Sequence, residues 1–412
     1  MTGYGETPQA EDATLFWQVG EESGKNHGRG TVSSGRRARD YGVVSGELPA
    51  GATDSIVDVA GVSVGHVTLA DGDLQTGVTA ILPHIGNLFR DKVPAACRVI
   101  NGFGKSAGLV QVAELGTIES PILLSNTFSV PACIEGGLDL LLEENADIAT
   151  STGSANVVAM ECNDGYLSAM RRRAVTRDHV LGAIATARSS GGAPFERGAV
   201  GAGRGMSCYG LKGGIGSASR IATMRAPGSA KGDEALYVVG ALLLTNFGRL
   251  PELVIDGRRV GRELVELGAG NASSMAVKTV AASGDTSGVG SPGAGSVIVV
   301  LATDAPLDSR QLHRLCIRAS SGLARTGASI GGGSGEIVLA FSTAYTMLHY
   351  PTAVVAARPA LHEDFLDGLF QAATESIEAA VIDSLFNANA VRGRDGHERR
   401  SLLDFGLFTS SP

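Results

Sequence analysis

The sequence has few aromatic residues and no long hydrophobic run. The first limits what can fill the core, and the second argues against a membrane-spanning helix. Only 5% of the 412 residues are aromatic, so we expect aliphatic side chains and alanine to fill the core. No stretch approaches the roughly 18 apolar residues that a membrane-spanning helix needs, and the N-terminus lacks a charged start followed by an apolar segment. We therefore expect a globular protein with no signal peptide and no membrane partner.

Cysteine and histidine are too scattered to suggest a metal site or a disulfide framework. The five cysteines form no C-x-x-C pair, and the eight histidines form neither an H-E-x-x-H motif nor an i, i+4 pair. We predict no metal ion and no other cofactor, and unpaired cysteines favour a reducing, cytoplasmic compartment. The net charge of −8 gives no reason to expect a nucleic-acid partner.

Glycine is abundant, with 57 residues, yet it forms no nucleotide-binding motif. Gly288, Gly290 and Gly293 satisfy G-x-G-x-x-G, but they follow a loop and precede a strand, whereas the dinucleotide motif follows a strand and opens a helix. The Gly-Lys-Ser at 104–106 lacks the first glycine of a P-loop, because Val99 occupies that position.

Hydrophobic patterns predict strands and helices in both halves of the chain. The expected strands cover 54–69, 76–83, 234–248, 296–303 and 335–344. The expected helices cover 134–145, 176–188 with Asp178 as N-cap, the segment that follows Asp308, and 363–387. Because strands precede helices in both halves without strict β-α-β alternation, we expect a layered α/β or α+β sandwich.

The ends and one internal segment differ in composition from the rest of the chain. Residues 1–36 are polar and glycine-rich, which predicts a disordered extension, and 391–412 are expected to be a C-terminal tail. Residues 37–390 would form a single domain. Within it, 269–294 consist almost wholly of Gly, Ala, Ser and Thr, and loops of this length are usually functional or disordered.

The junction between that loop and the next strand is the pair Gly295-Ser296. A serine hydroxyl is hardly ionised at neutral pH and needs a base to become a nucleophile. An N-terminal serine can use its own α-amine, whose pKa is about 7.7 to 8.0. Exposing that amine at Ser296 requires the chain to cut itself after Gly295. Local sequence alone favours the alternative that Gly295 simply forms a turn before a strand.

Three polar residues at strand ends favour the catalytic alternative. Ser334 and Glu336 stand two apart at the start of a strand, so their side chains are expected on the same face, where they would form a hydrogen-bond relay to a neighbouring strand. Asn246 ends a strand that reads as buried on both faces, and its amide is suited to stabilise an oxyanion. Each residue alone is more typical of a turn or cap.

Several segments carry a family resemblance when they are taken in order. They include IVDVAGVSVGHVTL, TGVTAILP, NGFGKSAG, LLSNTFSV, ECNDGYL, CYGLKGGIGSASR, TNFGRLPEL, GAGSVIVVLATDAPL and GGGSGEIVLAFSTA. Together they resemble the DmpA-type aminopeptidases, which include L-aminopeptidase/D-amidase-esterases and β-peptidyl aminopeptidases. The resemblance spans about 37–390.

The resemblance implies a fold, a maturation step and a reaction. The fold would be a four-layer αββα sandwich similar to N-terminal-nucleophile hydrolases, with the strand connectivity of the DmpA and ornithine acetyltransferase proteins. The precursor would cut itself between Gly295 and Ser296 into α (1–295) and β (296–412) chains, and αβ units would form a homo-oligomer. Ser296 would then hydrolyse small peptides, amides or esters with a free amine through an acyl-enzyme.

The resemblance also assigns roles to individual residues. Ser334 and Glu336 match the pair that hydrogen-bonds around the nucleophile, and Asn246 matches the oxyanion-hole asparagine. Glu161 matches the carboxylate that binds the substrate amine, since a buried carboxylate left unpaired by a blocked amine carries a desolvation cost. Asn163 departs from the pattern, because some relatives have tyrosine there; Tyr166 is not assumed to replace it.

Three alternatives stay open at this point. The enzyme could act on β-peptides or ω-amino-acid oligomers rather than on ordinary peptides. It could also transfer the acyl group to an amine instead of water. The chain could instead be an uncut binding or scaffold protein that kept the fold without activity.

Overall fold

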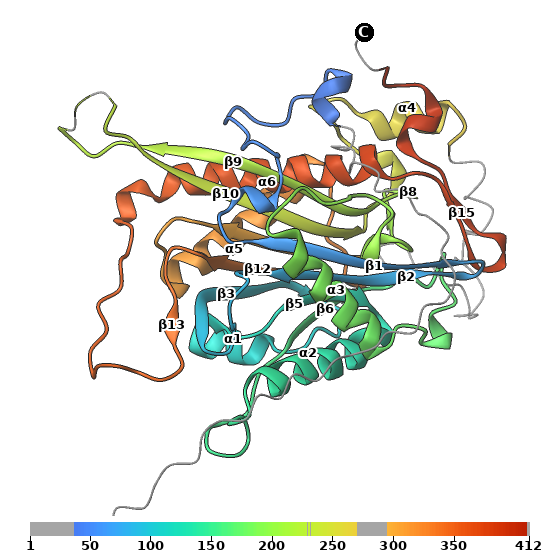
Figure 1. Cartoon of the computed structure of the whole chain (residues 1–412). Coiled ribbons are helices and arrows are strands. Elements are labelled where there is room, and N and C mark those ends of the chain that lie inside the picture. Colours follow the sequence, from blue (N-terminus) through green and yellow to red (C-terminus); the bar gives the residue numbers. More distant parts are fainter. Residues whose placement is uncertain (1–36, 229, 231, 270–294, 410–412) are drawn as a thin grey trace, which may run out of the picture. The chain divides into compact units, whose positions relative to one another are not determined.

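The computed structural model describes residues 37–409 apart from 229, 231 and 270–294. Two β-sheets lie face to face in this part of the chain, and helices cover the outer face of each sheet (Figure 1). The four layers confirm the αββα sandwich expected from the sequence. The extension 1–36 and the glycine-rich segment 270–294, both of which carried predictions, lie outside the described residues.

The first sheet has four strands in the order β1-β2-β5-β6. Its strands are β1 Ser63–Asp71, β2 Leu74–Leu82, β5 Ile122–Asn126 and β6 Val158–Cys162. Strands β1 and β2 pair antiparallel over their full length, whereas β5 and β6 run parallel. Two helices cover the outer face: α2 Val130–Glu144 and α3 Arg177–Ser190.

The second sheet is larger, with the order β13-β3-β12-β11-β10-β9. Its strands are β3 Asp91–Gly102, β9 Gly214–Met224, β10 Ala235–Asn246, β11 Gly295–Thr303, β12 Ser334–Ser342 and β13 Met347–Leu348, with β4 Thr117–Ile118 pairing with β3. Its outer face is covered by α5 Ser309–Arg325 and α6 Leu366–Asn387. Strand β11 is central, antiparallel to β10 and parallel to β12.

Shorter elements connect these layers. They are α1 Leu109–Leu115, α4 Val260–Glu266, and two small hairpins, β7 Ser207–Cys208 with β8 Leu211–Lys212 and β14 Val391–Arg392 with β15 Glu398–Arg399. No described helix is long and apolar enough to cross a membrane.

Strand β11 is buried on both faces, which explains its unbroken apolar sequence. Val297 and Val299 pack toward α5 and α6, whereas Ile298 and Val300 pack between the two sheets. Side chains alternate between the faces of a strand, so Ser296 shares the face of Ile298. The pleat thus directs the Ser296 side chain into the space between the sheets.

Most predicted elements are confirmed, with local differences. The strand expected over 54–69 begins only at Ser63, because the Asp58 carboxylate accepts hydrogen bonds from the amides of Thr53 and Ser55 and folds this apolar segment into a turn. Helix α3 is capped by Thr176 rather than by Asp178, and α6 starts at Leu366, three residues later than expected.

The C-terminal segment is not a simple tail. Residues 391–409 form the β14–β15 hairpin and a 3-10 turn at Leu402–Phe405, and the Leu402 side chain is fully buried in the core beside α6. The apolar residues of this segment are few and lie among charged ones, so their pattern was too short to predict the hairpin or the turn from the sequence. The segment therefore belongs to the packed unit that carries the site.

Candidate active site

The register of the large sheet places Ser296 between two partners. Ser296 lies opposite Asn246 on β10 and beside Gly335 on β12. Partners in register share a face, so all three face the space between the sheets. A Cβ atom at position 335 would lie 3.2 Å from Ser296 Oγ and 2.7 Å from the Phe103 carbonyl oxygen, so glycine leaves the room that the serine occupies.

The Ser296 hydroxyl lies against the peptide bond that precedes it. Its side chain is 7% exposed, and Oγ donates a hydrogen bond of 2.7 Å to the Gly295 carbonyl oxygen. The nucleophile is therefore next to the carbonyl group that the predicted cut would attack. Such proximity converts the attack into an intramolecular step, which is a large advantage in rate.

Asn246 is held from both ends of its amide. Its Oδ1 accepts a hydrogen bond of 2.9 Å from the Ser207 backbone amide, and its Nδ2 donates one of 2.9 Å to the Asn163 carbonyl oxygen. Because a donor faces the oxygen and an acceptor faces the nitrogen, the orientation of the amide is defined by its partners. One of the two N–H groups on Nδ2 remains for an oxyanion.

Glu161 lies at the end of β6 and is 3% exposed. Its Oε1 accepts a hydrogen bond of 2.7 Å from the Lys105 backbone amide, and its Oε2 accepts one from the Thr127 hydroxyl. No ion pair to Glu161 occurs within the part of the chain that the structure describes. A buried carboxylate with neutral partners is suited to bind a cationic ligand.

The ends of β6 and β10 bring Glu161 and Asn246 into one region. The Cys162 thiol contacts the Leu244 carbonyl oxygen at 3.6 Å, and the Asn163 carbonyl oxygen accepts the hydrogen bond from Asn246. Cys162 and Asn163, which follow Glu161 in the sequence, therefore contact β10, the strand that pairs with β11. The structure thus places Asn246 beside Ser296 on the large sheet, and Glu161 at the end of β6, which packs against β10 and β11.

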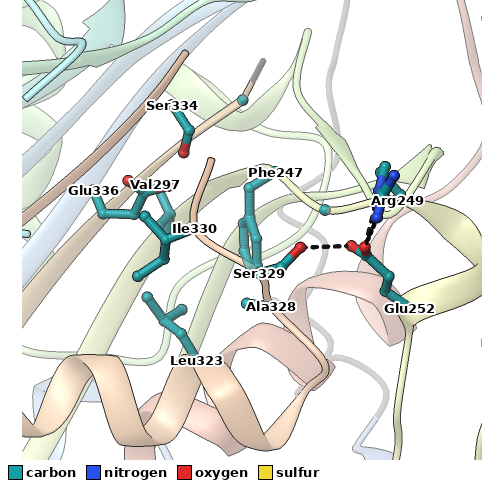
Figure 2. Close-up of a pocket in the computed structure, with 12 residues that line it drawn as sticks. Phe247, Arg249, Glu252, Val297, Leu323, Ala328, Ser329, Ile330, Ser334 and Glu336 are labelled. Atoms are coloured by element: carbon teal, nitrogen blue, oxygen red, sulfur yellow. Dashed lines mark hydrogen bonds and ion pairs between the residues drawn. The ribbon is translucent and has the colours of Figure 1, made fainter. Parts of the chain in front are cut away.

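Ser334 and Glu336 lie on the opposite face of the large sheet. Both are buried, and both line a cavity of about 40 Å³ together with Gly295 and Val297 (Figure 2). This confirms that they share a face, as their spacing predicted. The register pairs Ser334 with Gly295, so the two residues approach the Gly295-Ser296 peptide bond from the helix side, away from the Ser296 hydroxyl.

The Glu336 carboxyl is able to hold a proton near neutral pH. Burial raises its pKa to about 7. Its Oε2 has no hydrogen-bond partner among the described residues. The cavity has room for more than one water molecule, since each needs roughly 10–15 Å³. Across the cavity, Glu252 pairs with Arg249 and accepts a hydrogen bond of 3.1 Å from Ser329 (Figure 2).

Asn163 and Tyr166 do not present an aromatic hydroxyl to Asn246. The exposed Asn163 side chain accepts a hydrogen bond of 2.8 Å from the Gly165 amide and so closes a turn. The Tyr166 ring stacks on His397 with 4.5 Å between centroids, and Arg399 lies 3.6 Å from its centroid. Asn163 therefore contributes its backbone carbonyl group to the site, and Tyr166 does not replace the missing tyrosine.

Sequence reasoning missed three residues beside the site. Thr127 binds Glu161, Ser207 binds Asn246, and Asp164 is a fully buried carboxyl whose pKa is raised to about 7 by burial. Neither carboxyl oxygen of Asp164 has a hydrogen bond of normal geometry in the described residues, although the polar side chains of Thr76 and Asn126 lie nearby. Of the three, only Asp164 could have been suspected from the sequence, because it is an acidic residue three positions after Glu161.

Comparisons with known proteins agree on one family. Residues 54–399 match the family described as peptidase family S58. The chain is 37% identical over 374 residues to the β-peptidyl aminopeptidase BapA of Sphingosinicella microcystinivorans, covering 89% of each chain.

Two solved structures are similar over nearly the whole chain. A protein of Pyrococcus horikoshii OT3 is 44% identical with a TM-score of 0.78, covering 90% of this chain and 97% of that one. The L-aminopeptidase D-Ala-esterase/amidase of Ochrobactrum anthropi, described as a prototype for the serine aminopeptidases and a variant of the Ntn hydrolase fold, is 29% identical with a TM-score of 0.76, covering 89% and 95%.

The raised pKa of Glu336 predicts that replacing this residue changes protein stability by an amount that depends on pH. The comparison is between the Ser296→Ala protein and the same protein with Glu336→Gln added. An unfolded glutamate ionises near pH 4.3, whereas native Glu336 holds its proton until about pH 7. The native state therefore binds more protons in this window, and the stability contributed by this carboxyl falls as pH rises through it. Adding Glu336→Gln should change the melting temperature little at pH 4 and raise it at pH 8.

The matched control is Glu143→Gln, at an exposed position of α2, which should show no such pH dependence. Asp164 is present in every variant, so its own titration cancels in the comparison. An equal effect of Glu336→Gln at pH 4 and pH 8 would contradict the raised pKa.

Proposed function

The chain belongs to peptidase family S58 and is a serine aminopeptidase, and we propose that Ser296 is its nucleophile, exposed as an N-terminus by self-cleavage after Gly295. The observation that carries this proposal is the hydrogen bond of 2.7 Å from Ser296 Oγ to the Gly295 carbonyl oxygen. Processing would give fragments 1–295 and 296–412, and αβ units would assemble into a homo-oligomer.

Self-cleavage would proceed as an acyl shift. The Ser296 hydroxyl attacks the Gly295 carbonyl carbon, the C–N bond breaks, and the released amine takes the hydroxyl proton, which leaves an ester between the two residues. Water then hydrolyses the ester and frees the Gly295 carboxylate and the Ser296 hydroxyl. Ser334 and Glu336 support this step, because they flank the same peptide unit from the cavity side and a carboxyl with a pKa of about 7 can accept and return a proton.

Substrate hydrolysis would use the same nucleophile. The α-amine of Ser296 takes the hydroxyl proton as Oγ attacks the substrate carbonyl carbon, and the Asn246 amide stabilises the resulting oxyanion. The leaving amine takes the proton, which gives an acyl-enzyme that water hydrolyses. Glu161 would bind the free amino group of the substrate, since it is a buried carboxylate without an ion pair in the described chain.

Self-cleavage predicts two fragments from wild-type protein. Intact-mass analysis should find 1–295 and a second fragment that begins Ser-Val-Ile-Val at residue 296, whereas Ser296→Ala should stay a single 42.1 kDa chain without activity. Ser291→Ala is the control, because it removes a nearby serine and should leave the cut unchanged. A fully active preparation of uncut wild-type chain would contradict the proposal, and a stable inactive one would favour the scaffold alternative.

Glu161 predicts a preference for substrates with a free amine. Wild-type protein should hydrolyse an amino-acid p-nitroanilide much faster than its N-acetylated form, and Glu161→Gln should reduce that ratio by about 10- to 100-fold, the value of a hydrogen bond to a charged group. The ratio of kcat/KM values for the two substrates measures this directly. The same ratio in Glu161→Gln and wild-type protein would exclude Glu161 as the amine-binding group; Glu143→Gln is the charge-matched control.

A second candidate concerns the substrate backbone. The relative that is 37% identical is named a β-peptidyl aminopeptidase. This name supports the proposal that the present enzyme also takes substrates whose first residue is a β-amino acid. Such a residue places one more carbon between the amine bound by Glu161 and the carbonyl carbon attacked by Ser296. We expect a higher kcat/KM for a β-homoalanyl p-nitroanilide than for the L-alanyl one; the reverse order would favour α-peptides.

A further inference from the structure

A buried lysine lies behind the candidate oxyanion group. Lys212 ends the β7–β8 hairpin and is 0% exposed. Its ammonium donates hydrogen bonds to three backbone carbonyl oxygens, those of Gly203 at 2.9 Å, Met206 at 2.7 Å and Gly213 at 2.7 Å. The function proposed above uses neither this lysine nor these carbonyl groups.

The hydrogen bonds indicate that Lys212 is charged. A neutral amine has two N–H donors and an ammonium has three, so three carbonyl acceptors match the charged form. Burial opposes this and lowers the pKa of Lys212 well below its usual range, with Arg204 and Arg399 adding to the effect and the Asp164 carboxyl opposing it. The three carbonyl groups replace the water that the ammonium has lost.

One of these carbonyl groups connects the ammonium to Asn246. The Met206 carbonyl belongs to the same peptide unit as the Ser207 amide, and that amide donates to Asn246 Oδ1 at 2.9 Å. The path from the ammonium therefore crosses two amide groups, first the peptide unit and then the Asn246 side chain. In both, the carbonyl oxygen accepts a hydrogen bond and the nitrogen donates the next one. Aligned hydrogen bonds of this kind polarise one another.

We propose that Lys212 is a positioning residue for the oxyanion group: its ammonium holds and polarises the Met206-Ser207 peptide unit, which in turn orients the Asn246 amide and strengthens it as a donor. This inference rests on the proposed role of Asn246. Lys212 does not touch the reacting atoms; it acts through Asn246 on the charge that develops at the substrate carbonyl oxygen.

The proposal differs from a purely structural role in what it predicts for catalysis. A lysine that only ties residues 203–213 together would affect folding stability, and its loss would add to the loss of Asn246. If the lysine acts through Asn246, its loss should lower kcat with little change in KM, and its loss should have no further effect once Asn246 is absent. A double-mutant cycle separates the two roles.

The test compares Lys212→Met, Asn246→Ala and the double variant in processed protein with a free-amine p-nitroanilide. Asn246→Ala should lower kcat by about 100- to 1,000-fold, as expected for loss of one oxyanion donor. Lys212→Met should lower kcat by about tenfold with KM nearly unchanged, which is less than the roughly 100-fold cost of misplacing a reacting group by about 1 Å. The double variant should be no slower than Asn246→Ala.

Thr326→Val is the matched control. The Thr326 hydroxyl hydrogen-bonds the Tyr209 hydroxyl at 2.8 Å and so anchors the same hairpin from outside the path to Asn246. It should lower the melting temperature while kcat stays near the wild-type value. If Lys212→Met does not fold, Lys212→Gln replaces it, because glutamine removes the charge and keeps two of the three N–H donors for the carbonyl groups.

The outcomes are distinct. A normal kcat in Lys212→Met or Lys212→Gln, or a full tenfold loss on top of Asn246→Ala, would overturn the role of Lys212 and leave the proposed function intact. A normal kcat in Asn246→Ala would overturn the oxyanion assignment itself. Loss of activity in Ser296→Ala checks the nucleophile independently of both.

Discussion

The pairing register of β10, β11 and β12 is the constraint on which the rest of the site depends. Residue 296 is brought beside Asn246 and Gly335 by backbone hydrogen bonds along strands that are buried on both faces. A slip of one residue would turn Ser296 toward α5 and α6 and a valine toward the small sheet. The apolar side chains on both faces of β11 therefore protect the position of one hydroxyl group.

The same pleat divides the polar groups of the site between two compartments. The hydroxyl of Ser296 and the amide of Asn246 lie between the sheets, whereas Ser334 and Glu336 lie in the cavity on the helix side. The Gly295-Ser296 peptide unit is reachable from both. A carboxyl that holds a proton can thus act on the main chain at this junction without standing where a substrate amine would bind.

Patterns that depend on near neighbours were readable from the sequence. The apolar run of β11, the shared face of Ser334 and Glu336 and the place of Asn246 at a strand end all follow from the two-residue period of a strand. Strand β9 was not recognised because its first half consists of small residues, which lack the β-branched pattern of a strand and leave room for α6: a Cβ at Gly216 would lie 1.9 Å from the Ala380 carbonyl oxygen. Nor could sequence reveal that Ser207 and Lys212 stand behind Asn246, since that depends on tertiary contacts across the fold.

The central place of β11 has a consequence for how the protein would unfold. Residues on both sides of position 295 share one sheet: β11 pairs with β10 before the junction, β12 pairs with β3, and the Arg400 carbonyl oxygen accepts a hydrogen bond from the Lys212 amide. Once the chain is cut, the halves cannot separate without opening the core, and unfolded halves would have to find each other again as separate molecules. The persistence of the mature enzyme would then be governed by the rate at which it opens rather than by an equilibrium.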